Sequence, residues 1–471
     1  MASHGKTRGG IRRGAIEGLP VVRRNVAGVD LGSQRHWVCA PAKDGDGREV
    51  ADFGATTPEL TRMAEWLLER KVASVAMEST GIYWIAPFEI LESRGLEVLL
   101  VDTRQLARVP GRDKKTDPTD SEWIQRLHSC GLLRGSYRPS EQICMLRTLI
   151  RDKANLVAER GDWVRRMQKS LDQMNVRVHR AVSDLDGVTG MAMVRAIIAG
   201  ERDAGKLAQL RDPRCRKSAE EIAEQLSGHW REDHLFSLGQ ALKMYDSIEQ
   251  QIGEYDQEIL GRLDAMQRED LRTQDVPAVR NAKKGKSIRK RGEDPMREAL
   301  FRLSGADLTS IDALGVETAQ VVLSEYGADL SRFPTEKQFV QHIRLAPYTP
   351  STGGKVMKKK RPNTASTRVA RAFQMAALSA RHSQTALGAY YRMTARRKDG
   401  GIAVFATARK LATLVYRLLR WGQECTDEGA AAAEKRYEQA RLSSLKAKAK
   451  DLGYYLLPCA GPLTSAEEVT G

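Results

Sequence analysis

The sequence predicts a mixed α/β domain at the N-terminus, a long helical middle region and a mostly α-helical C-terminal domain. Three patterns support this: apolar runs that alternate with helical segments up to Asp102, apolar residues at heptad intervals from Leu149, and a glycine turn between helical segments after Asp294. A chain of 471 residues is also too long for one ordinary domain. We expect a basic flexible arm (1–21), a first domain (22–139), a helical region (140–281), a basic loop (282–293), a second domain (294–424) and a tail (425–471).

Five strands and two helices are expected in the first domain. The strands are Val26–Asp30, Arg35–Ala40, Glu49–Phe53, Val72–Glu78 and Leu96–Asp102, and the helices are Pro58–Lys71 and Ile82–Arg94. A Gly/Asp turn joins the second and third strands as a hairpin. The order βββαβαβ, with acids at the ends of the first and fourth strands, is that of an RNase H-like sheet.

Four acidic residues of this domain are candidates for one metal site. Asp30 ends an apolar strand that turns immediately at Gly32, and Glu78 ends the buried fourth strand. Asp117 stands at the start of a helix and shares one face of it with Asp120, three residues on. Two divalent ions about 4 Å apart need several carboxylates, and oxygen ligands select magnesium or manganese over zinc. Taken singly, such an acid is more typical of a turn or a helix cap.

Three motifs in this domain resemble those of a known family. They are Val29-Asp-Leu-Gly32, Ala76-Met-Glu-Ser-Thr-Gly-Ile-Tyr-Trp84 and Lys115-Thr-Asp-Pro-Thr-Asp-Ser-Glu-Trp123. In order and spacing they are similar to the DEDD transposases of the insertion-sequence "one-ten" family. The resemblance implies a RuvC-like catalytic domain and a non-coding bridge RNA that guides the enzyme to its donor and target DNA. It also implies a metal-binding tetrad, holding two Mg²⁺ or Mn²⁺ ions, made of Asp30, Glu78, Asp117 and Asp120.

The charge of the chain suits a nucleic-acid partner. Lys and Arg number 76 against 60 Asp and Glu, so the net charge is +16 and the pI is near 9.6. A surplus spread along most of the chain favours a long polyanion as partner, although many soluble proteins are basic without binding one. The six scattered cysteines contain no Cys-x-x-Cys pair and indicate reduced thiols. No run is apolar enough for a membrane span and the N-terminus does not resemble a signal peptide, so we expect a cytoplasmic, nucleoid-associated protein.

The middle region contains two apolar seams. The first runs Leu149, Leu156, Trp163, Met167, Leu171, Met174 and Val178, and the second runs Leu235, Leu238, Leu242, Tyr245, Ile252 and Ile259. Matching stripes at these intervals predict either an antiparallel helical hairpin within one chain or a dimerising coiled coil. The resemblance favours the coiled coil, because it implies dimers that pair across two DNAs as a tetramer. The segment from Gly187 to His229 has no pattern that assigns it.

Two segments are candidates for phosphate contacts. A basic loop from Arg280 to Arg291 contains Lys283, Lys284 and Arg289, and is either a plain linker or a phosphate-contacting strand. The segment Leu308–Ala319, with the helix that follows it, resembles a helix-hairpin-helix. In that motif the turn at Gly315 presents backbone N–H groups to a phosphate. A glycine-capped turn between two helices would have a similar sequence.

A third candidate is the loop that precedes a lysine run. This loop either holds a phosphate between its backbone N–H groups and its lysines, or is an ordinary flexible turn. Its residues are Ser351, Thr352, Gly353, Gly354, Lys355, Lys358, Lys359, Lys360 and Arg361. The segment Leu308–Trp421 resembles the second domain of the family, whose loop normally reads Ser-Gly-Gly and carries a nucleophilic serine. Here Thr352 precedes the glycines and Ser351 is one residue earlier. We favour Ser351 as the nucleophile; the alternatives are Thr352 and a copy that cleaves poorly.

The patterns and the resemblance together imply an RNA-guided DNA transposase or recombinase that uses the metal site and a hydroxyl nucleophile. One alternative is a RuvC-like nuclease that cleaves branched DNA with water alone. Another is a nucleic-acid-binding scaffold that has lost activity. In the second domain, amphipathic helices are expected at Thr367–Ala380 and Thr407–Trp421, whereas the Ala/Glu/Lys-rich tail gives no functional signal.

Overall fold

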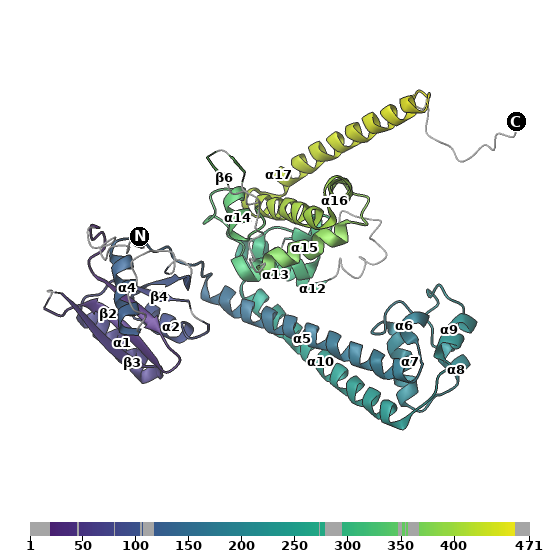
Figure 1. The fold of residues 1–471 in the computed structure, drawn as a ribbon, viewed down its shortest axis with the longest axis horizontal. Helices are drawn as coiled ribbons and strands as arrows, with labels where there is room; N and C mark the ends of the chain where they lie inside the picture. The colour runs from purple at the N-terminus through teal and green to yellow at the C-terminus, as the bar shows by residue number, and fades with distance from the viewer. Residues whose placement is uncertain are drawn as a thin grey trace, which may run out of the picture. The chain divides into compact units, whose positions relative to one another are not determined.

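A computed structural model of the chain describes residues 19–44, 47–79, 81–103, 106, 117–272, 274–277, 294–346, 351–353, 355–356 and 367–456. The chain divides into two compact units, Met1–Arg138 and Pro139–Gly471 (Figure 1). The first unit is a sheet with helices on both faces, and the second is built almost entirely of helices. None of the described helices is both long and apolar enough to cross a membrane.

The first unit is built on a five-stranded mixed sheet. Its strands are β1 (Val26–Leu31), β2 (Arg35–Pro41), β3 (Arg48–Gly54), β4 (Ser74–Glu78) and β5 (Glu97–Val101). They lie in the order β3-β2-β1-β4-β5, with β2 antiparallel to β1 and β3, and with β1, β4 and β5 parallel. The five expected strands are therefore present, and their order is consistent with an RNase H-like domain.

Each face of the sheet has its own apolar core. Helices α1 (Thr57–Glu69) and α2 (Ile85–Ser93) pack on one face, where Val29 and Met77 are fully buried. Helix α4 (Asp117–Ser129) covers the other face (Figure 1). There Ala76 packs with Ile124 of the helix. Because successive side chains of a strand point to opposite faces, the odd-numbered residues of β1 face α1 and α2, and the even-numbered ones face α4.

Two long helices dominate the first part of the second unit. Helix α5 (Glu141–Gln173) and helix α10 (Glu232–Ala265) pack along each other. Ion pairs link Lys153 to Asp256 and Arg160 to Glu249. Seven residues forward on α5 thus correspond to seven residues backward on α10, so the two helices are antiparallel partners within one chain.

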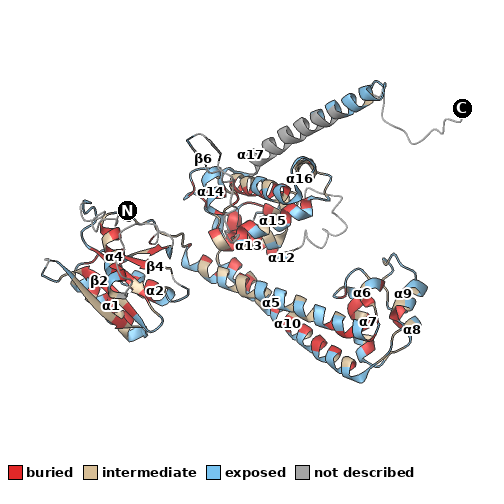
Figure 2. Cartoon of the chain, viewed as in Figure 1, coloured by how far each residue is buried: buried red, intermediate tan, exposed pale blue. Residues whose placement is uncertain are grey.

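The expected first seam is confirmed in its second part, where Met167, Leu171, Met174 and Val178 are buried, and differs in its first part. Leu149, Leu156 and Trp163 are only half-buried, whereas Ile143, Leu146 and Ile150 are buried near the start of the helix (Figure 2). This stripe packs on α13 (Val316–Tyr326), a helix far along the chain. Heptad spacing within α5 could not reveal a partner so distant in sequence.

A small helical module joins the two long helices and fills the segment that had no sequence assignment. Its helices are α6 (Val178–Ala181), α7 (Val188–Ile198), α8 (Ala204–Gln209) and α9 (Ala219–Leu226). Their apolar residues share one core with the adjoining ends of α5 and α10. The chain enters and leaves the module at one place, where the N–H of His229 donates to the carbonyl of Met174 at 2.7 Å.

The remainder of the second unit is a helical bundle with one small hairpin. Its elements are η1 (Glu269–Leu271), α12 (Pro295–Ser304), η3 (Leu308–Ser310), α13, α14 (Glu336–His342), β6 (Ser351–Thr352), β7 (Lys355–Val356), α15 (Arg368–Ala380), α16 (Ala386–Arg397) and α17 (Gly400–Asp451). Aromatic residues fill its core, and the buried hydroxyl of Tyr416 donates to the carbonyl of Phe333 at 2.5 Å. Helix α17 is interrupted at Gly422, whose φ of 81° is not helical. The helix thus begins at Gly400, earlier than the expected Thr407, and its break at Gly422 coincides with the expected end at Trp421.

Candidate functional site

Two of the predicted acids end neighbouring parallel strands. Val29 of β1 is the register partner of Met77 of β4, so the next residues, Asp30 and Glu78, form the following pair along the two strands. Val29 and Met77 both point into the core beneath α1 and α2. Asp30 and Glu78 therefore project from the opposite face, at the carboxyl edge of the sheet, and both are half-buried.

Helix α4 crosses that face in a direction that brings its first turn toward the acids. Near its C-terminal end, Nε2 of His128 lies 2.9 Å from Oγ of Ser74, the first residue of β4. Earlier in the helix, the Gln125 amide donates to the carbonyl of Val26, the first residue of β1, at 3.2 Å. The end of α4 thus lies over the strand starts, and its beginning lies toward the strand ends, where Asp30 and Glu78 stand.

A glycine permits this close packing. A Cβ placed on Gly28 would lie 2.2 Å from the backbone N of Gln125 and 2.5 Å from the backbone O of Ser121. Real Cβ atoms do not approach backbone atoms so closely, so any other residue would push α4 off the sheet. Gly28 lies on the α4 face of β1, two residues before Asp30, so the position of the helix and that of the acid depend on the same short stretch.

The other two predicted acids lie in the first turn of α4. Asp120 is only 4% exposed, so its carboxyl is held among protein groups. Asp117 is the first residue of the helix, and its side chain is outside the described part of the structure. Asp30 and Glu78 thus end two neighbouring strands, and the helix that carries Asp117 and Asp120 runs over the same face with its first turn toward those strand ends.

Donor chemistry fits a hard divalent cation, and the described acids alone do not complete a site. Carboxylate oxygens are the ligands that Mg²⁺ and Mn²⁺ prefer. Among the side chains that the structure describes, however, no group of three or more His, Cys, Asp or Glu residues is gathered closely enough to hold an ion. The metal site therefore stays a prediction, and the side chain of Asp117, which would contribute to it, lies outside the described residues.

Sequence reasoning missed an aromatic residue beside the acids. Trp37 of β2 is the register partner of Asp30 on one side and of Asp52 of β3 on the other. Residues paired directly across strands point to the same face, so the half-buried indole of Trp37 shares the acid face. The sequence did contain a signal for this: because Val38 faces the opposite core, the alternation of side chains along β2 puts Trp37 on the acid face.

The segment after Glu78 also places apolar side chains in solvent. Ile82 is 74% exposed and Tyr83 is 44% exposed, although Trp84, the next residue, packs edge-on against Phe88. The turn at Gly81 has a φ of 54°, in the left-handed region that favours glycine. In the segment from Glu78 to Trp84, Trp84 therefore anchors α2. Ile82 and Tyr83 form an exposed apolar patch a few residues after Glu78.

A histidine and a cysteine on the same face are structural. Burial lowers the pKa of His128 to about 4, with Arg23 lowering it further and Glu97 opposing, so the ring stays neutral at physiological pH. Burial raises the pKa of the Cys39 thiol to about 12, which leaves it protonated and a poor nucleophile. Neither residue supplies an acid–base or nucleophilic group to this edge.

The predicted hydroxyl loop forms a two-residue hairpin in the second unit. Ser351 pairs with Val356 and Thr352 pairs with Lys355, and the turn residue Gly353 has a φ of 56°. The side chains of Ser351, Thr352 and Lys355 are outside the description. The other predicted phosphate contacts in these loops lie wholly outside the described residues; they are Gly354, Lys358, Lys359, Lys360, Arg361, Lys283, Lys284 and Arg289.

Gly315 is the N-cap of α13, as a phosphate-binding turn requires. A Cβ at this position would lie 2.9 Å from Oε2 of Glu317, so a carboxylate of the helix's own first turn lies against the cap. The preceding helix, α12, is separated from α13 by η3 and a turn, with Ala313 at a φ of 68°. The helix-hairpin-helix therefore stays a prediction.

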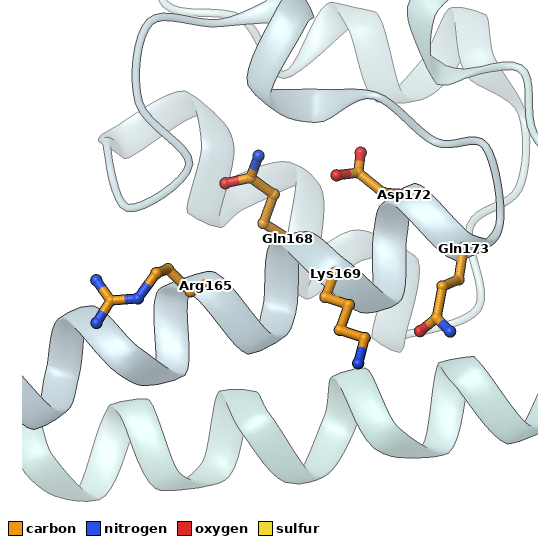
Figure 3. Close-up of a pocket in the computed structure, with 5 residues that line it drawn as sticks. All are labelled: Arg165, Gln168, Lys169, Asp172 and Gln173. Atoms are coloured by element: carbon orange, nitrogen blue, oxygen red, sulfur yellow. The ribbon is translucent and has the colours of Figure 1, made fainter.

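An open pocket on α5 lies apart from these predicted residues in the chain. It is lined by Arg165, Gln168, Lys169, Asp172 and Gln173, all from the last two and a half turns of the helix (Figure 3). Two of its charges already have partners, since Arg165 pairs with Asp162 and Asp172 lies 3.3 Å from Nδ1 of His179. We find no reactive group in it.

Comparisons with known proteins identify the class and then the family. A family model of DEDD transposases of the IS110 type, described as "Transposase", matches residues 27–176, which include β4, α4, all of β1 but its first residue, and all four acids. A second model, described as "Transposase IS116/IS110/IS902 family", matches residues 305–392. The chain belongs to the IS110 family of transposases.

One curated relative shares part of the sequence. The "Insertion element IS116 uncharacterized 44.8 kDa protein" of Streptomyces clavuligerus is 24% identical over 158 residues. The match spans 33% of this chain and 40% of the relative. The helical module between α5 and α10 falls outside both family models, and so does everything after residue 392.

Proposed function

We propose that the protein cuts and rejoins DNA as the transposase of an insertion sequence, guided by a bridge RNA. The observation that supports this is the parallel register of β1 and β4, whose final residues include Asp30 and Glu78, on the face of the sheet that α4 covers. It occurs in a chain of which two separate segments, residues 27–176 and 305–392, match transposase families. The expected partners are donor DNA, target DNA and the guide RNA.

The metal site of this proposal is the DEDD tetrad. Asp30, Glu78, Asp117 and Asp120 hold Mg²⁺ or Mn²⁺ in an RNase H-like, RuvC-like domain. When bound, such ions neutralise charge on the phosphate undergoing transfer. The protein's own contribution is to position the carboxylates: β1 and β4 hold two of them in register, and packing at Gly28 places the helix that carries the others.

The nucleophile of the proposal is the hydroxyl of Ser351, with Thr352 as the alternative. The hydroxyl oxygen forms a bond to the scissile phosphorus while the bond from phosphorus to the 3′ oxygen breaks. The hydroxyl loses its proton, and the departing 3′ oxygen gains one to become a 3′-OH. The product is a 5′-phosphoryl enzyme, which a 3′-OH of another DNA end attacks to restore the hydroxyl and a phosphodiester.

Two further features belong to the proposal. The antiparallel pair of α5 and α10 acts as a coiled-coil arm through which copies of the chain associate, as a dimer and as a tetramer across two DNAs. The basic loop residues and the turn at Gly315 contact nucleic-acid phosphates. Backbone N–H groups at the N-cap of α13 support the second point.

The test is a search for a covalent protein–DNA adduct. Full-length protein is incubated with magnesium, donor DNA and candidate flanking RNA, and adducts are resolved by denaturing electrophoresis. The proposal expects an adduct in the wild type that is lost in Ser351→Ala and kept in Thr352→Ala. Asp30→Asn and Glu78→Gln should abolish it, and omission of the RNA should reduce it strongly.

Other outcomes identify the alternatives. Strand cleavage that survives replacement of both Ser351 and Thr352 would establish a nuclease that uses water. Tight DNA binding with no cleavage under any metal or RNA condition would establish a binding scaffold. An adduct lost only in Thr352→Ala would assign the nucleophile to the threonine.

A further inference from the structure

The last described part of α17 and the residues after it form a segment that packs on nothing in the described chain. We define residues 439–456 as the C-terminal arm. Upstream in the same helix, Leu411, Ala412 and Val415 are fully buried in the bundle. In the arm, none of the residues whose side chains are described is buried, and all of them but Ala449 are exposed (Figure 2).

The arm nevertheless has a defined end. Gly453 adopts a φ of 82°, and the N–H of Tyr454 donates to the carbonyl of Ala449 at 2.8 Å. This is the Schellman arrangement that terminates a helix. An isolated helix with no packed face is only marginally stable in water. A helix with a specific stop and no packing partner among the described residues is therefore suited to ordering on a ligand.

The side chains of the arm combine positive charge with exposed aromatic rings. Lys446, Lys448 and Lys450 lie in the last turns, and Asp451 is the one acid between residues 445 and 456. Directly after the helix, Tyr454 is 72% exposed and Tyr455 is 87% exposed. Lysines that contact phosphates beside aromatic rings that stack on bases are how proteins bind unpaired nucleic-acid strands.

A second copy of the chain is the main rival occupant. Leu442 and Leu445 are exposed on the helix and would suit a helical partner. If two copies of the arm paired through these leucines, the lysines of both copies would lie close together. Each copy has only Asp451 in this stretch to offset their positive charge. Like charges at such spacing oppose helix pairing. The charge of the arm thus complements a polyanion and opposes self-association.

We propose that the C-terminal arm binds an unpaired stretch of nucleic acid, with Lys446 and Lys450 on phosphates and Tyr454 and Tyr455 stacked on bases. The arm lies beyond both segments matched by the family models. The proposal does not depend on the acid site, and it gives a role to a tail whose composition indicated none. The strand is either RNA or single-stranded DNA, which share this chemistry.

The test is nucleic-acid binding by the full-length chain. Fluorescence anisotropy is measured with a labelled single-stranded DNA, the RNA of the same sequence and the corresponding DNA duplex, over a range of salt. The variants are Lys446→Gln with Lys450→Gln, and Tyr454→Ala with Tyr455→Ala, with Phe at both tyrosines as a rescue. The matched control is Lys243→Gln with Lys398→Gln, which removes two exposed lysines elsewhere.

The lysine variant should lower the salt slope of single-strand binding by about 1.4, or roughly 0.7 for each lysine, and the control should not. The tyrosine variant should weaken binding about 5-fold or more for each stacked base, with Phe restoring it and duplex binding unaffected. Such losses on RNA, on single-stranded DNA or on both support the proposal, and the strand with the larger loss is the natural ligand. Arm variants that bind like the control would overturn it. So would variants that change only the sedimenting mass of the protein, since that result assigns the arm to a second copy.

Discussion

The Oγ of Ser74 at the start of β4 lies 2.9 Å from Nε2 of His128 near the end of α4. Ser74 and Glu78 are opposite ends of one strand, so this contact holds the far end of α4 at the edge away from the acids. The helix can then reach the acids only with its first turn, where Asp120 lies. One buried hydrogen bond thus sets the direction in which the candidate metal ligands are presented.

The stability of the first unit should fall in mild acid because of this histidine. Burial lowers the pKa of folded His128 to about 4, whereas the unfolded side chain titrates near 6.5. Between these values the unfolded state binds more protons, so stability is lost as pH falls from about 6.5 toward 4, by on the order of 3 kcal/mol, and no further below that. The pH dependence is measured by unfolding the full-length protein in urea at several pH values. Pulsed hydrogen exchange, read on the peptic fragments that contain β1, β4 and α4, gives the unfolding midpoint of the first unit. His128→Gln should flatten the pH dependence, and equal dependence in both proteins would contradict the assignment.

Gly28→Ala should disable the site although it removes no ligand. The added Cβ would meet the backbone of Gln125 and Ser121, which cannot move aside as a flexible side chain can. We expect a loss of stability of about 3 kcal/mol or more and loss of adduct formation. Gly261→Ala in α10 is the matched control, because nothing lies within 4 Å of its Cβ position. If the two variants show the same activity and unfolding midpoint, α4 does not pack on β1 as described.

Charge exchange should verify the antiparallel pairing of the long helices. Arg160→Glu places two acids together, because Arg160 pairs with Glu249. The change should cost about 1 kcal/mol, which is the scale of a partly exposed ion pair, and adding Glu249→Arg should recover most of it. Chemical denaturation of the three proteins measures the coupling. A double variant no more stable than the single one would place the two residues apart.

The ion pair between Arg297 and Asp307 should be the most sensitive one in the helical bundle. Both side chains are almost fully buried, at 5% and 3% exposure, and their atoms are 2.5 Å apart. Arg297 also donates from Nε to Oγ1 of Thr309 at 3.1 Å. Asp307→Ala leaves a buried guanidinium unpaired and should cost about 3–5 kcal/mol. The double variant Arg297→Met with Asp307→Ala should lose less free energy of unfolding than Asp307→Ala alone. If chemical denaturation shows the double variant to be the less stable of the two, the buried ion pair does not have this role.

The sequence predicted what depends on local pattern. Asp30 and Glu78 could be placed at strand ends because each closes an apolar run. The direction of α4 could not be predicted, because it rests on the contact of His128 with Ser74, 54 residues away. Likewise the buried stripe of α5 at Ile143 faces α13, a partner that no heptad count reveals.

The module between α5 and α10 shows the same limit. Its helices are short, and each has too few apolar positions to display a period. They are ordered by a core shared with the ends of the long helices, where Met167 and Leu238 are fully buried. Trp37 was overlooked for a related reason: the alternation of β2 indicates which face it occupies, but its place beside Asp30 follows from the cross-strand register, which the paired strands reveal.

The central claim, that these acids hold a divalent ion, is tested most directly by Mn²⁺ binding. Free Mn²⁺ is measured by electron paramagnetic resonance during titration of the full-length protein and its variants. Glu78→Gln and Asp120→Asn should each weaken binding at least about 10-fold, as loss of a charged ligand requires. Glu97→Gln is the control, because Glu97 begins β5 at the opposite edge of the same sheet. Affinities that are the same in all four proteins would show that the acids do not form a metal site.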